Sequence, residues 1–589
     1  MKNNILNFIS IILFIPSIFL FYLGFKGENI YYELYAVLLI FSSSVIFHVK
    51  NSVKNIVTIF FYLTIFLFVI GRPTISFLKN QNFWYVDFKS SLMALHITYI
   101  SLISIFIISI VLSFINLQPK NSVVKSRISI YIKYLVYGAI IFKIIVRLVN
   151  FILLRGSSYT SLYLGNSGLP SSILTLADVS VYLYFIYLAL LPTKKEYYNI
   201  TIIYFISLLP NLLLGLRGDF SSFILVSIVY IFYRHYVQKD TQEVWLNKKI
   251  LSTFFVFLLG IMLLLSFVGN IRENKKSSSS IIDFVYLQGT TFDTMSQGVY
   301  YNNYLPKREN VNYTFSSFSE GVKQNPLIKI LVKSESYPSG NSAAKATKGE
   351  NLAHNLSYVV LGDSYLTGHG RGTSYILENY LDFGRKGVVA FSVLLGMILF
   401  YLPYLFKNSI AGRFIALNIS IGLFSLPRGE ATSFLIFFFD IKLWLALLLV
   451  YIFKKLYDKT NVFDVLERYR NERMSKILKT NFVSKLRLIN VKDIFSLIFI
   501  YPLAYIVSRF YRSKNKNLIL VCESEQEARD NGYWLYKYIR EKYSDENIVY
   551  VIDFNSPDYN KVKSLGKCIN YGSFKHWIYY LSANVVVST

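Results

Sequence analysis

Apolar stretches of about 20 residues recur through the first three quarters of the chain, and no other feature of the sequence constrains the fold as strongly. Each stretch is long enough to cross a hydrocarbon core about 30 Å thick as a helix. The whole chain is 54% hydrophobic. The pattern predicts an all-α polytopic membrane protein with about twelve transmembrane helices, near 5–25, 30–49, 55–71, 92–116, 131–154, 172–192, 198–214, 220–237, 250–269, 387–406, 410–426 and 433–453.

Lysine and arginine in the short loops between these stretches predict the orientation. Such residues favour the cytoplasmic side of a membrane. With the N-terminus in the cytoplasm, the inner short loops carry thirteen of them and the outer short loops carry seven. Twelve helices return the chain to its starting side, so both termini are expected on the cytoplasmic face of the membrane.

Arginine-glycine pairs fall at the outer ends of three predicted helices. NLLLGLRGDF places Arg217 and Asp219 after the seventh helix, and LPRGEATSF places Arg428 and Glu430 after the eleventh. LLRGSSY places Arg155 ahead of the sixth. All three motifs therefore face the same side of the membrane.

The one long connection of the transmembrane region, about 270–386, also falls outside. Long connections in compact proteins are usually functional or disordered. This one ends in LGDSYLTGHGRGTSYILENYLDFGRKG at 361–387, which has too many aromatic and apolar residues for a linker. The end of the external loop is therefore a further source of candidate site residues.

Arginine beside glycine suits the binding of phosphate groups. A guanidinium is permanently charged and presents a planar fork to phosphate oxygens, and glycine lets backbone amides approach the same anion. An acidic neighbour two residues on either holds the arginine in place or acts as a base toward a hydroxyl. The alternative is topological, because interfacial arginines snorkel and loop glycines make turns. Three motifs on one face favour a site for a lipid-linked phosphate or pyrophosphate.

The arrangement resembles the Wzy-type O-antigen polymerases, also known as oligosaccharide repeat-unit polymerases, and their relatives the O-antigen ligases. The matching features are the GLRGDF motif at the outer end of a middle helix, one large external loop late in the chain, and the closing segment GRGTSYILENYLDFGRKGVVAF. The resemblance covers residues 1–455. It implies a glycosyltransferase that uses no nucleotide sugar, no metal and no other cofactor.

Such enzymes transfer a growing glycan from an undecaprenyl-pyrophosphate carrier to a new lipid-linked repeat unit. Cations that stabilise the leaving pyrophosphate lower the barrier, and a carboxylate or histidine takes the proton of the acceptor hydroxyl. The resemblance assigns the pyrophosphate contacts to Arg217, Arg428 and Arg371, with Arg155 as a further candidate whose following glycines lack the family's usual spacing. The candidates for the base, left unranked, are Asp219, Glu430, Glu378 and His369, with His354 as a second histidine.

Charged residues inside the predicted helices form a separate group. Lys143 and Arg147 lie four residues apart, hence on one helical face, and Asp178 lies in the next helix. Intramembrane charges usually face the bundle interior or a cavity, so these residues form either a groove for the polyprenyl phosphate or an ion pair between helices. The sequence favours phosphate binding for Arg147 and an ion pair for Asp440 with Lys442.

The segment after the last predicted helix is strongly basic. Residues 454–516 carry fifteen Lys or Arg and five Asp or Glu, which is +10 of the chain's net charge of +27. An apolar run at 494–510 with basic flanks predicts an interfacial helix on the anionic inner leaflet. We interpret 457–516 as a cytoplasmic linker that contacts the bilayer, and the positive charge needs no nucleic acid to explain it.

Residues 517–589 have the pattern of a soluble α/β domain. The apolar strands NLILVCES, ENIVYVIDF and VVVST alternate with helical segments, and KCINYGSFKHWIYYLSAN is a further strand-to-helix passage, as at the start of a parallel, Rossmann-like sheet. DNGYWLYKYI, YGSFKHWIYYLSAN and VVVST resemble the start of the CDP-glycerol glycerophosphotransferases, which build teichoic-acid-like polyol phosphates in the cytoplasm. The histidine-containing catalytic motifs of that family would lie beyond Thr589, so this truncated segment is expected to be inactive, either a partial fusion or a docking remnant.

The sequence therefore predicts a polymerase for a cell-surface polysaccharide, O-antigen or capsule, that works on undecaprenyl-pyrophosphate-linked donor and acceptor at the outer face of the membrane. One alternative is a ligase that passes glycan to another acceptor. Another is a flippase or other transporter, although the sequence has no internal repeat and its charged motifs cluster at one face. A membrane-anchored glycerophosphotransferase is the third. Candidate partners are a flippase and a chain-length regulator of the same pathway.

Cysteine and histidine add little to this interpretation. The only two cysteines, Cys522 and Cys568, fall in the predicted cytoplasmic tail, where a disulfide is not expected. No Cys/His cluster has metal-ligand spacing. The sequence predicts no metal site.

Overall fold

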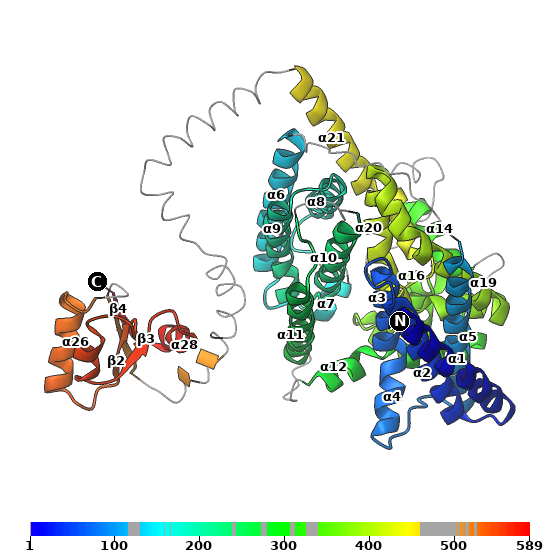
Figure 1. The fold of residues 1–589 in the computed structure, drawn as a ribbon, viewed down its shortest axis with the longest axis horizontal. Coiled ribbons are helices and arrows are strands. Elements are labelled where there is room, and N and C mark those ends of the chain that lie inside the picture. Colours follow the sequence, from blue (N-terminus) through cyan, green and yellow to red (C-terminus); the bar gives the residue numbers. More distant parts are fainter. Residues whose placement is uncertain are drawn as a thin grey trace. The chain divides into compact units, whose positions relative to one another are not determined.

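The computed structural model describes residues 2–459 and 517–588 except for short gaps, together with a few residues between these ranges. The gaps are 116–129, 158, 165–166, 238–242, 273–279, 307–311, 325–339 and 524–526. The chain divides into two compact units, Met1–Thr460 and Asn461–Thr589, and each is described by itself (Figure 1). Most of the interfacial helix predicted at 494–510 lies outside the described residues.

The first unit is almost entirely helical, as expected. Its longer helices are α1 (Lys2–Lys26), α2 (Ile30–Val49), α3 (Ile56–Ile65), which continues through η1 (Phe66–Ile70) into α4 (Gly71–Leu78), α5 (Phe88–Ser113), α6 (Ile130–Leu154), α8 (Ser171–Ala189), α9 (Lys194–Leu213), α10 (Gly218–Val237), α11 (Lys248–Arg272), α19 (Tyr375–Asn408), α20 (Ile410–Ser425) and α21 (Ile441–Lys459). Among the described residues, ten segments are long and apolar enough to cross a membrane, or eleven if one bent pair counts as a span. The predicted all-α polytopic fold is confirmed.

Two of the twelve predicted spans differ from a straight apolar helix. α9 forms and is started by a capping box between Thr193 and Glu196, but it is not among the ten segments because its asparagines, tyrosines and charged first turn lower its hydropathy. The last predicted span is bent by 44° between η5 (Ser433–Phe439) and α21. Asp440 lies at the bend and accepts hydrogen bonds from the Tyr182 hydroxyl at 2.8 Å and the Lys442 amide at 3.0 Å. A charged side chain at the bend therefore interrupts the helix.

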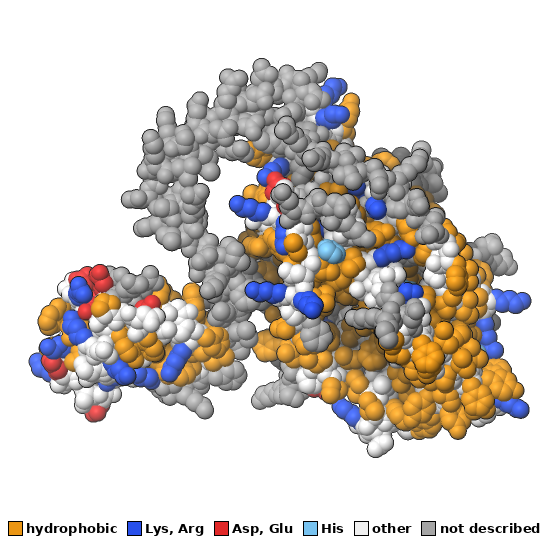
Figure 2. Space-filling view, in the orientation of Figure 1, with side chains coloured by type: hydrophobic (Ala, Val, Ile, Leu, Met, Phe, Trp, Pro, Cys, Tyr) orange, Lys and Arg blue, Asp and Glu red, His pale blue; other side chains and the backbone are white. Residues whose placement is uncertain are grey.

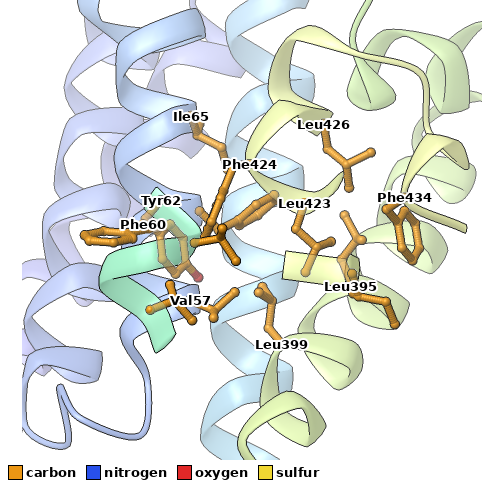
Figure 3. Close-up of a cluster of buried hydrophobic side chains, with 14 of the residues drawn as sticks. Val57, Phe60, Tyr62, Ile65, Leu395, Leu399, Leu423, Phe424, Leu426 and Phe434 are labelled. Atoms are coloured by element: carbon orange, nitrogen blue, oxygen red, sulfur yellow. The ribbon is translucent and has the colours of Figure 1, made fainter. Parts of the chain in front are cut away.

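The core of the first unit lies where α3, α19 and α20 meet. Phe60 of α3 and Phe424 of α20 pack edge to face with ring centroids 6.0 Å apart. Leu395 and Leu399 of α19 are buried in the same cluster (Figure 3). Leu426 in the short helix η4 (Leu426–Arg428) is buried there as well. The core therefore fixes the position of the chain immediately before Arg428.

The outer surface of the bundle is apolar where a bilayer would contact it. Hydrophobic side chains cover much of the face shown in Figure 2, over the region of α1 and α2. Only 17% of the apolar window of α1 is buried, and Phe8, Ile15 and Phe19 are each more than half exposed. Apolar surface on this scale marks contact with lipid or protein.

The connection between α11 and α19 is folded into short helices. These are α12 (Ile281–Gln288), α13 (Thr291–Tyr300), η2 (Asn302–Tyr304), η3 (Tyr313–Phe315), α14 (Ser316–Gln324), α16 (Ala343–Lys348), α17 (Leu352–Leu361) and α18 (Asp363–Leu366). Another short helix, α7 (Tyr159–Tyr163), follows α6. α13 packs against α5 and α19, and an added Cβ on Gly298 would lie 2.4 Å from Leu377. The predicted external loop is thus docked on the helices that precede and follow it.

The second unit contains a parallel four-stranded sheet. Strands β1 (Ile519–Cys522), β2 (Ile548–Ile552), β3 (Cys568–Asn570) and β4 (Val585–Ser588) are arranged in the order β3-β2-β1-β4. They alternate with α26 (Asn531–Lys542), α27 (Tyr559–Lys563) and α28 (Phe574–Ser582). The predicted α/β segment is confirmed, with the CIN segment forming a strand of its own. Cys522 and Cys568 are free thiols.

Candidate functional site

The turn between α12 and α13 joins segments that lie far apart in the sequence. Gly289 in this turn packs against α4 so closely that an added Cβ would lie 2.4 Å from the Cβ of Arg72. On the facing helix, an added Cβ on Gly71 would lie 2.5 Å from Val285 of α12. Because only glycine permits such an approach, these two positions bring Arg72 beside the start of α13.

Arg72 is held by one carboxylate and two tyrosines. Its Nη2 lies 3.2 Å from Oδ2 of Asp293 on α13, and its Nε donates to the Tyr85 hydroxyl at 2.7 Å. The guanidinium carbon lies 4.8 Å and 4.5 Å from the ring centroids of Tyr85 and Tyr286. These contacts hold a permanent positive charge on a side chain that is only 13% exposed.

Asp293 is the acidic partner of this arginine. Its side chain is buried, and its second oxygen, Oδ1, has no hydrogen-bond partner among the described residues. Burial raises the pKa of Asp293 to about 7, against the opposing effect of the Arg72 and Arg371 charges. A carboxyl group with a pKa near neutrality is suited to proton transfer at physiological pH.

Arg371 approaches Asp293 from the segment that precedes α19. Its amide donates to the Ser357 hydroxyl at 2.9 Å, and its carbonyl accepts from the Thr294 hydroxyl at 3.2 Å. Within the described part of the chain its Nε atom has no hydrogen-bond partner. The anchored backbone therefore places a second guanidinium near the same carboxylate.

Arg428 reaches the same turn from η4. Its Nη1 donates to Oε1 of Gln288, the last residue of α12, at 3.2 Å, and its guanidinium carbon lies 5.8 Å from the ring centroid of Phe68. The side chain is exposed. We refer to Arg72, Arg371 and Arg428 as the arginine cluster. The sequence predicted two of its members, and the structure brings them to one turn.

Glu378 and Glu430, two predicted candidates for the base, connect the segment after η4 to α17 and α19. Glu378 is fully buried, and its two oxygens accept hydrogen bonds from the Thr373 hydroxyl at 2.9 Å and the Ala431 amide at 2.8 Å. Glu430 accepts a hydrogen bond from the side-chain amide of Asn351. Burial raises the pKa of Glu430. Both carboxyl groups are therefore already engaged in holding the backbone around the arginine cluster.

The GLRGDF motif forms the turn between α9 and α10. The end of α9 is closed by a Schellman arrangement around Gly215, whose φ is 87°. Arg217 donates to the Leu265 carbonyl of α11 at 2.8 Å. Asp219 is exposed in the first turn of α10, close enough to Lys143 for their charges to interact. The motif thus lies toward α6 and α11.

Arg147 on α6 pairs with Asp178 on α8. Its Nη2 lies 2.7 Å from both carboxylate oxygens. Lys143 adds a second cation, with its Nζ atom 3.6 Å from Oδ1 of the same aspartate and 3.1 Å from the Tyr204 hydroxyl. Of the two predicted alternatives, the structure shows the ion pair between helices.

Arg147 also lines a cavity of about 170 Å³. The other polar lining residues are Asn150, Tyr163, Ser167 and Asn211, and leucines form the rest of the wall. A binding role for Arg147 is therefore compatible with its ion pair. The other predicted pair is also present, with the Lys442 Nζ 3.2 Å from Oδ2 of Asp440.

The two candidate histidines and Arg155 occupy different positions. His369 is exposed and lies two residues before Arg371. His354 has its Nδ1 atom 2.9 Å from the Tyr365 hydroxyl, and burial lowers its pKa to about 4. Arg155 is exposed just after the end of α6. His354 is therefore neutral at physiological pH, and its ring is held by a tyrosine.

Sequence reasoning missed two members of the site, Arg72 and Asp293. Arg72 carries a usable signal, since it stands beside Gly71 as Arg217 and Arg428 stand beside their glycines. Asp293 stands in the segment TTFDTMS with no charged neighbour. Asp293 can be recognised only in the structure, where Arg72 and Arg371 approach it.

Acidic, histidine and cysteine side chains do not converge into a metal site in the described part of the chain, where no group of three or more is placed to hold a metal ion. The positive charge that the described residues supply at this site comes from the arginine cluster and from Lys79, whose Nζ lies 5.9 Å from the ring centroid of Tyr286.

Comparison with known proteins agrees with the fold of each unit. Residues 5–461 match the family described as O-antigen polysaccharide polymerase Wzy, and residues 503–589 match the CDP-Glycerol:Poly(glycerophosphate) glycerophosphotransferase family. The chain is also 36% identical over 74 residues to the minor teichoic acid biosynthesis protein GgaB of Bacillus subtilis (strain 168), a match that covers 13% of this chain and 8% of that protein. No solved structure matches.

A bundle of apolar helices that carries an arginine cluster beside buried carboxyl groups defines a polytopic membrane protein with a polar, cationic site. Its family follows from the match over most of the chain: this protein belongs to the O-antigen polysaccharide polymerase Wzy family. It is therefore a membrane polysaccharide polymerase.

Proposed function

We propose that the chain polymerises oligosaccharide repeat units carried on undecaprenyl pyrophosphate, by glycosyl transfer at the outer face of the cytoplasmic membrane. The arginine cluster is the observation that supports this, because three guanidinium groups from distant segments gather around one turn. The planar fork of arginine matches phosphate oxygens better than the point charge of lysine does. A pyrophosphate leaving group requires such charges where it departs.

The proposed reaction forms one bond and breaks one. The hydroxyl oxygen of the acceptor sugar bonds to the anomeric carbon of the donor glycan, while the bond from that carbon to the pyrophosphate oxygen breaks. The pyrophosphate leaves with the electron pair, and the arginine cluster stabilises its charge. Removing one such stabilising group costs about 10²–10³-fold in rate in well-studied enzymes.

The other predicted cations have contacts that suit a different part of the ligand. Arg147 lines the cavity and is paired with Asp178, and Arg217 is bound to a carbonyl of α11. We assign both to the carrier lipid or the glycan rather than to the pyrophosphate. Arg155 is exposed and receives no role in this scheme.

We further propose a division of the chain into a polymerase domain at 1–456, with an external loop at about 270–386, a basic linker at 457–516, and a glycerophosphotransferase-like segment at 517–589. Both termini are then cytoplasmic. The family match of the last segment supports a second candidate function, the transfer of glycerol phosphate on the cytoplasmic side. Proposed partners are the bilayer, the lipid-linked donor and acceptor, and the flippase and chain-length regulator of the same pathway.

The test is the length of the surface polysaccharide in a host that lacks its own polymerase, separated on a gel. The variants are Arg371→Ala and Arg428→Ala, with Arg385→Ala as a matched control because Arg385 is exposed and packs on Phe25 instead. A variant truncated after residue 456 tests whether polymerisation needs the C-terminal tail.

We expect the two cluster variants to insert normally and to leave single repeat units on the surface. The control and the shortened chain should still give long polymer. Failure of single repeats to reach the surface at all would favour transport. If the two cluster variants give full-length polymer that stays unattached to its final acceptor, a ligase would be favoured. Either result would refute the proposal.

A further inference from the structure

Glycosyl transfer to a hydroxyl needs a group that takes the hydroxyl proton, and the structure places a carboxylate for this step that the sequence does not mark. We propose that Asp293 is the general base, with its Oδ1 atom accepting the proton of the acceptor sugar. This inference rests on the proposed function and adds a catalytic residue to it.

The two oxygens of Asp293 have different surroundings. Oδ2 lies 3.2 Å from Nη2 of Arg72, while Oδ1 is buried and, over the described residues, accepts no hydrogen bond. A buried polar atom without a partner costs free energy and needs an explanation. A ligand hydroxyl that donates to Oδ1 in the working enzyme supplies that explanation.

The charges around Asp293 come from several elements. Arg72 on α4 and Arg371 before α19 both act on it, and Tyr85 lies beside it. Three further elements, α5, α19 and η2, pack against α13. Of their ionisable groups, His96 lies 3.1 Å from Glu33 and Glu378 accepts the two hydrogen bonds described above. Lys89 of α5 and Tyr304 of η2 are exposed. η1, which also packs on α13, contributes only apolar side chains.

The other carboxyl and imidazole candidates fit this step less well. Both oxygens of Glu378 accept hydrogen bonds from the protein. Glu430 is bound to Asn351. Asp219 and His369 are exposed, where a carboxylate or imidazole keeps its water. Among the candidates in the described residues, Asp293 combines a buried oxygen that has no hydrogen-bond partner with direct contact to the arginine cluster.

The position of Asp293 beside the arginine cluster matches the geometry that the reaction needs. The attacked anomeric carbon must lie within bonding reach of the acceptor oxygen and, until it departs, of the pyrophosphate oxygen. A base next to the cations that receive the pyrophosphate satisfies both requirements. In the step itself the acceptor proton passes to Oδ1, the acceptor oxygen bonds to the anomeric carbon, and the pyrophosphate leaves with the electron pair. Asp293 then releases the proton to water.

The experiment uses the full-length protein in lipid vesicles. The substrate is the lipid-linked repeat unit extracted from polymerase-deleted cells of the source organism. The initial polymerisation rate is measured from about pH 5.5 to about pH 8.5, and binding of undecaprenyl pyrophosphate is measured separately. The variants are Asp293→Asn and Asp293→Glu. Asp363→Asn is the matched control, because Asp363 is exposed in α18.

The wild-type rate should rise with pH in one step near neutrality, which we call the limb of the pH–rate profile. The reason is that burial puts the pKa of Asp293 at about 7 and the base works in its ionised form. Asp293→Asn should bind undecaprenyl pyrophosphate as the wild type does, polymerise about 100-fold more slowly or worse, and lose the limb. Asp293→Glu should regain part of the rate and move the limb. The control should match the wild type.

Two results would overturn the assignment while leaving the polymerase function in place. One is an Asp293→Asn variant that polymerises at close to the wild-type rate or keeps the same limb. The other is a wild-type rate that is flat across neutral pH, which needs no variant and so holds even if the variants misfold. A wild type that neither binds undecaprenyl pyrophosphate nor polymerises would instead refute the proposed function, and the base assignment with it.

Discussion

Two arginine–aspartate pairs within the same helical unit have opposite surroundings. Arg147 binds both oxygens of Asp178, and Lys143 adds a second cation to the same carboxylate. Arg72 binds one oxygen of Asp293, and the other oxygen is left without a hydrogen bond in the described structure. We call the first pair closed, because both carboxylate oxygens are bound, and the second pair open, because one carboxylate oxygen is not.

The difference separates an aspartate that is engaged by cations on both oxygens from one that keeps an oxygen for a ligand in our proposal. A carboxylate whose two oxygens are already bound by cations of the protein is a weaker acceptor for a substrate hydroxyl. Removing it, however, leaves buried cations without a counter-charge. A carboxylate such as Asp293 has an oxygen that a ligand can use, and its removal leaves one cation, Arg72, which still donates to the Tyr85 hydroxyl. The comparison therefore predicts different effects of the two replacements: replacing Asp178 mainly lowers stability, and replacing Asp293 mainly lowers the polymerisation rate.

The largest expected effect is on stability at the closed pair. Asp178→Ala leaves Lys143, which is 3% exposed, and Arg147 without their anion, and we expect a loss of about 3–5 kcal/mol. The measurement is the amount of protein in the membrane and its apparent melting temperature in detergent. Asp440→Ala is the control, because its partner Lys442 is 32% exposed and an exposed pair contributes about 1 kcal/mol or less. A stable Asp178→Ala protein that makes no polymer would instead show that Asp178 acts in the site and not in the stability of the fold.

Most of the fold could be predicted from the sequence, because a bilayer imposes a simple rule on length and apolarity. Ten of the twelve predicted helices form as apolar spans. The rule fails where local chemistry competes with it. α9 is too polar to count by composition alone, although it packs among its neighbours. The last span bends at Asp440, whose side chain hydrogen-bonds to Tyr182 from another helix. A partner 258 residues away in sequence cannot be seen in a hydropathy window.

The site could be predicted only in part, for a related reason. Arginine beside glycine is a local signal, and it identifies Arg428 and the GRG segment of Arg371. That signal does not report the partners of an arginine: it does not show that Arg147 is paired with a neighbouring helix or that Arg428 is exposed near Gln288. Asp293 has no local signal at all, because its environment is created by the packing of α13 against α5 and η1 and by the approach of Arg72 from α4. Burial and partner choice are properties of the tertiary structure.

The second prediction disturbs the open pair without removing a charge. Gly289→Ala would place a methyl group 2.4 Å from the Cβ of Arg72, so α12 and α4 must separate and the arginine must move. We expect about a 10²-fold loss of polymerisation rate, since displacements of about 1 Å have such effects at reacting groups. The control is Gly260→Ala in α11, where an added Cβ meets no atom within 4 Å. Equal rates for both variants would show that the position of Arg72 is unimportant.

The smallest expected effect is the pH dependence of stability at Asp293. Burial raises the pKa of this group from 3.8 to about 7 in the folded protein, so the folded state binds its proton more tightly than the unfolded state does. Stability from this group is then fully present below about pH 4 and is lost as the pH rises toward 7. Asparagine resembles the protonated form and has no such dependence.

The comparison of wild type with Asp293→Asn should therefore change with pH. Between about pH 5.5 and about pH 6.5, over one pH unit below the folded pKa, we expect the melting temperature of the wild type relative to the variant to fall by about 2 °C, on the order expected for about 1.4 kcal/mol in a large domain. Glu320 and Glu430 also have raised pKa values because of burial, but they are present in both proteins and cancel in the difference. A difference that stays constant with pH would mean that Asp293 is ionised throughout. Its pair with Arg72 would then be as closed as that of Asp178 with Arg147, and the contrast between the two pairs would disappear.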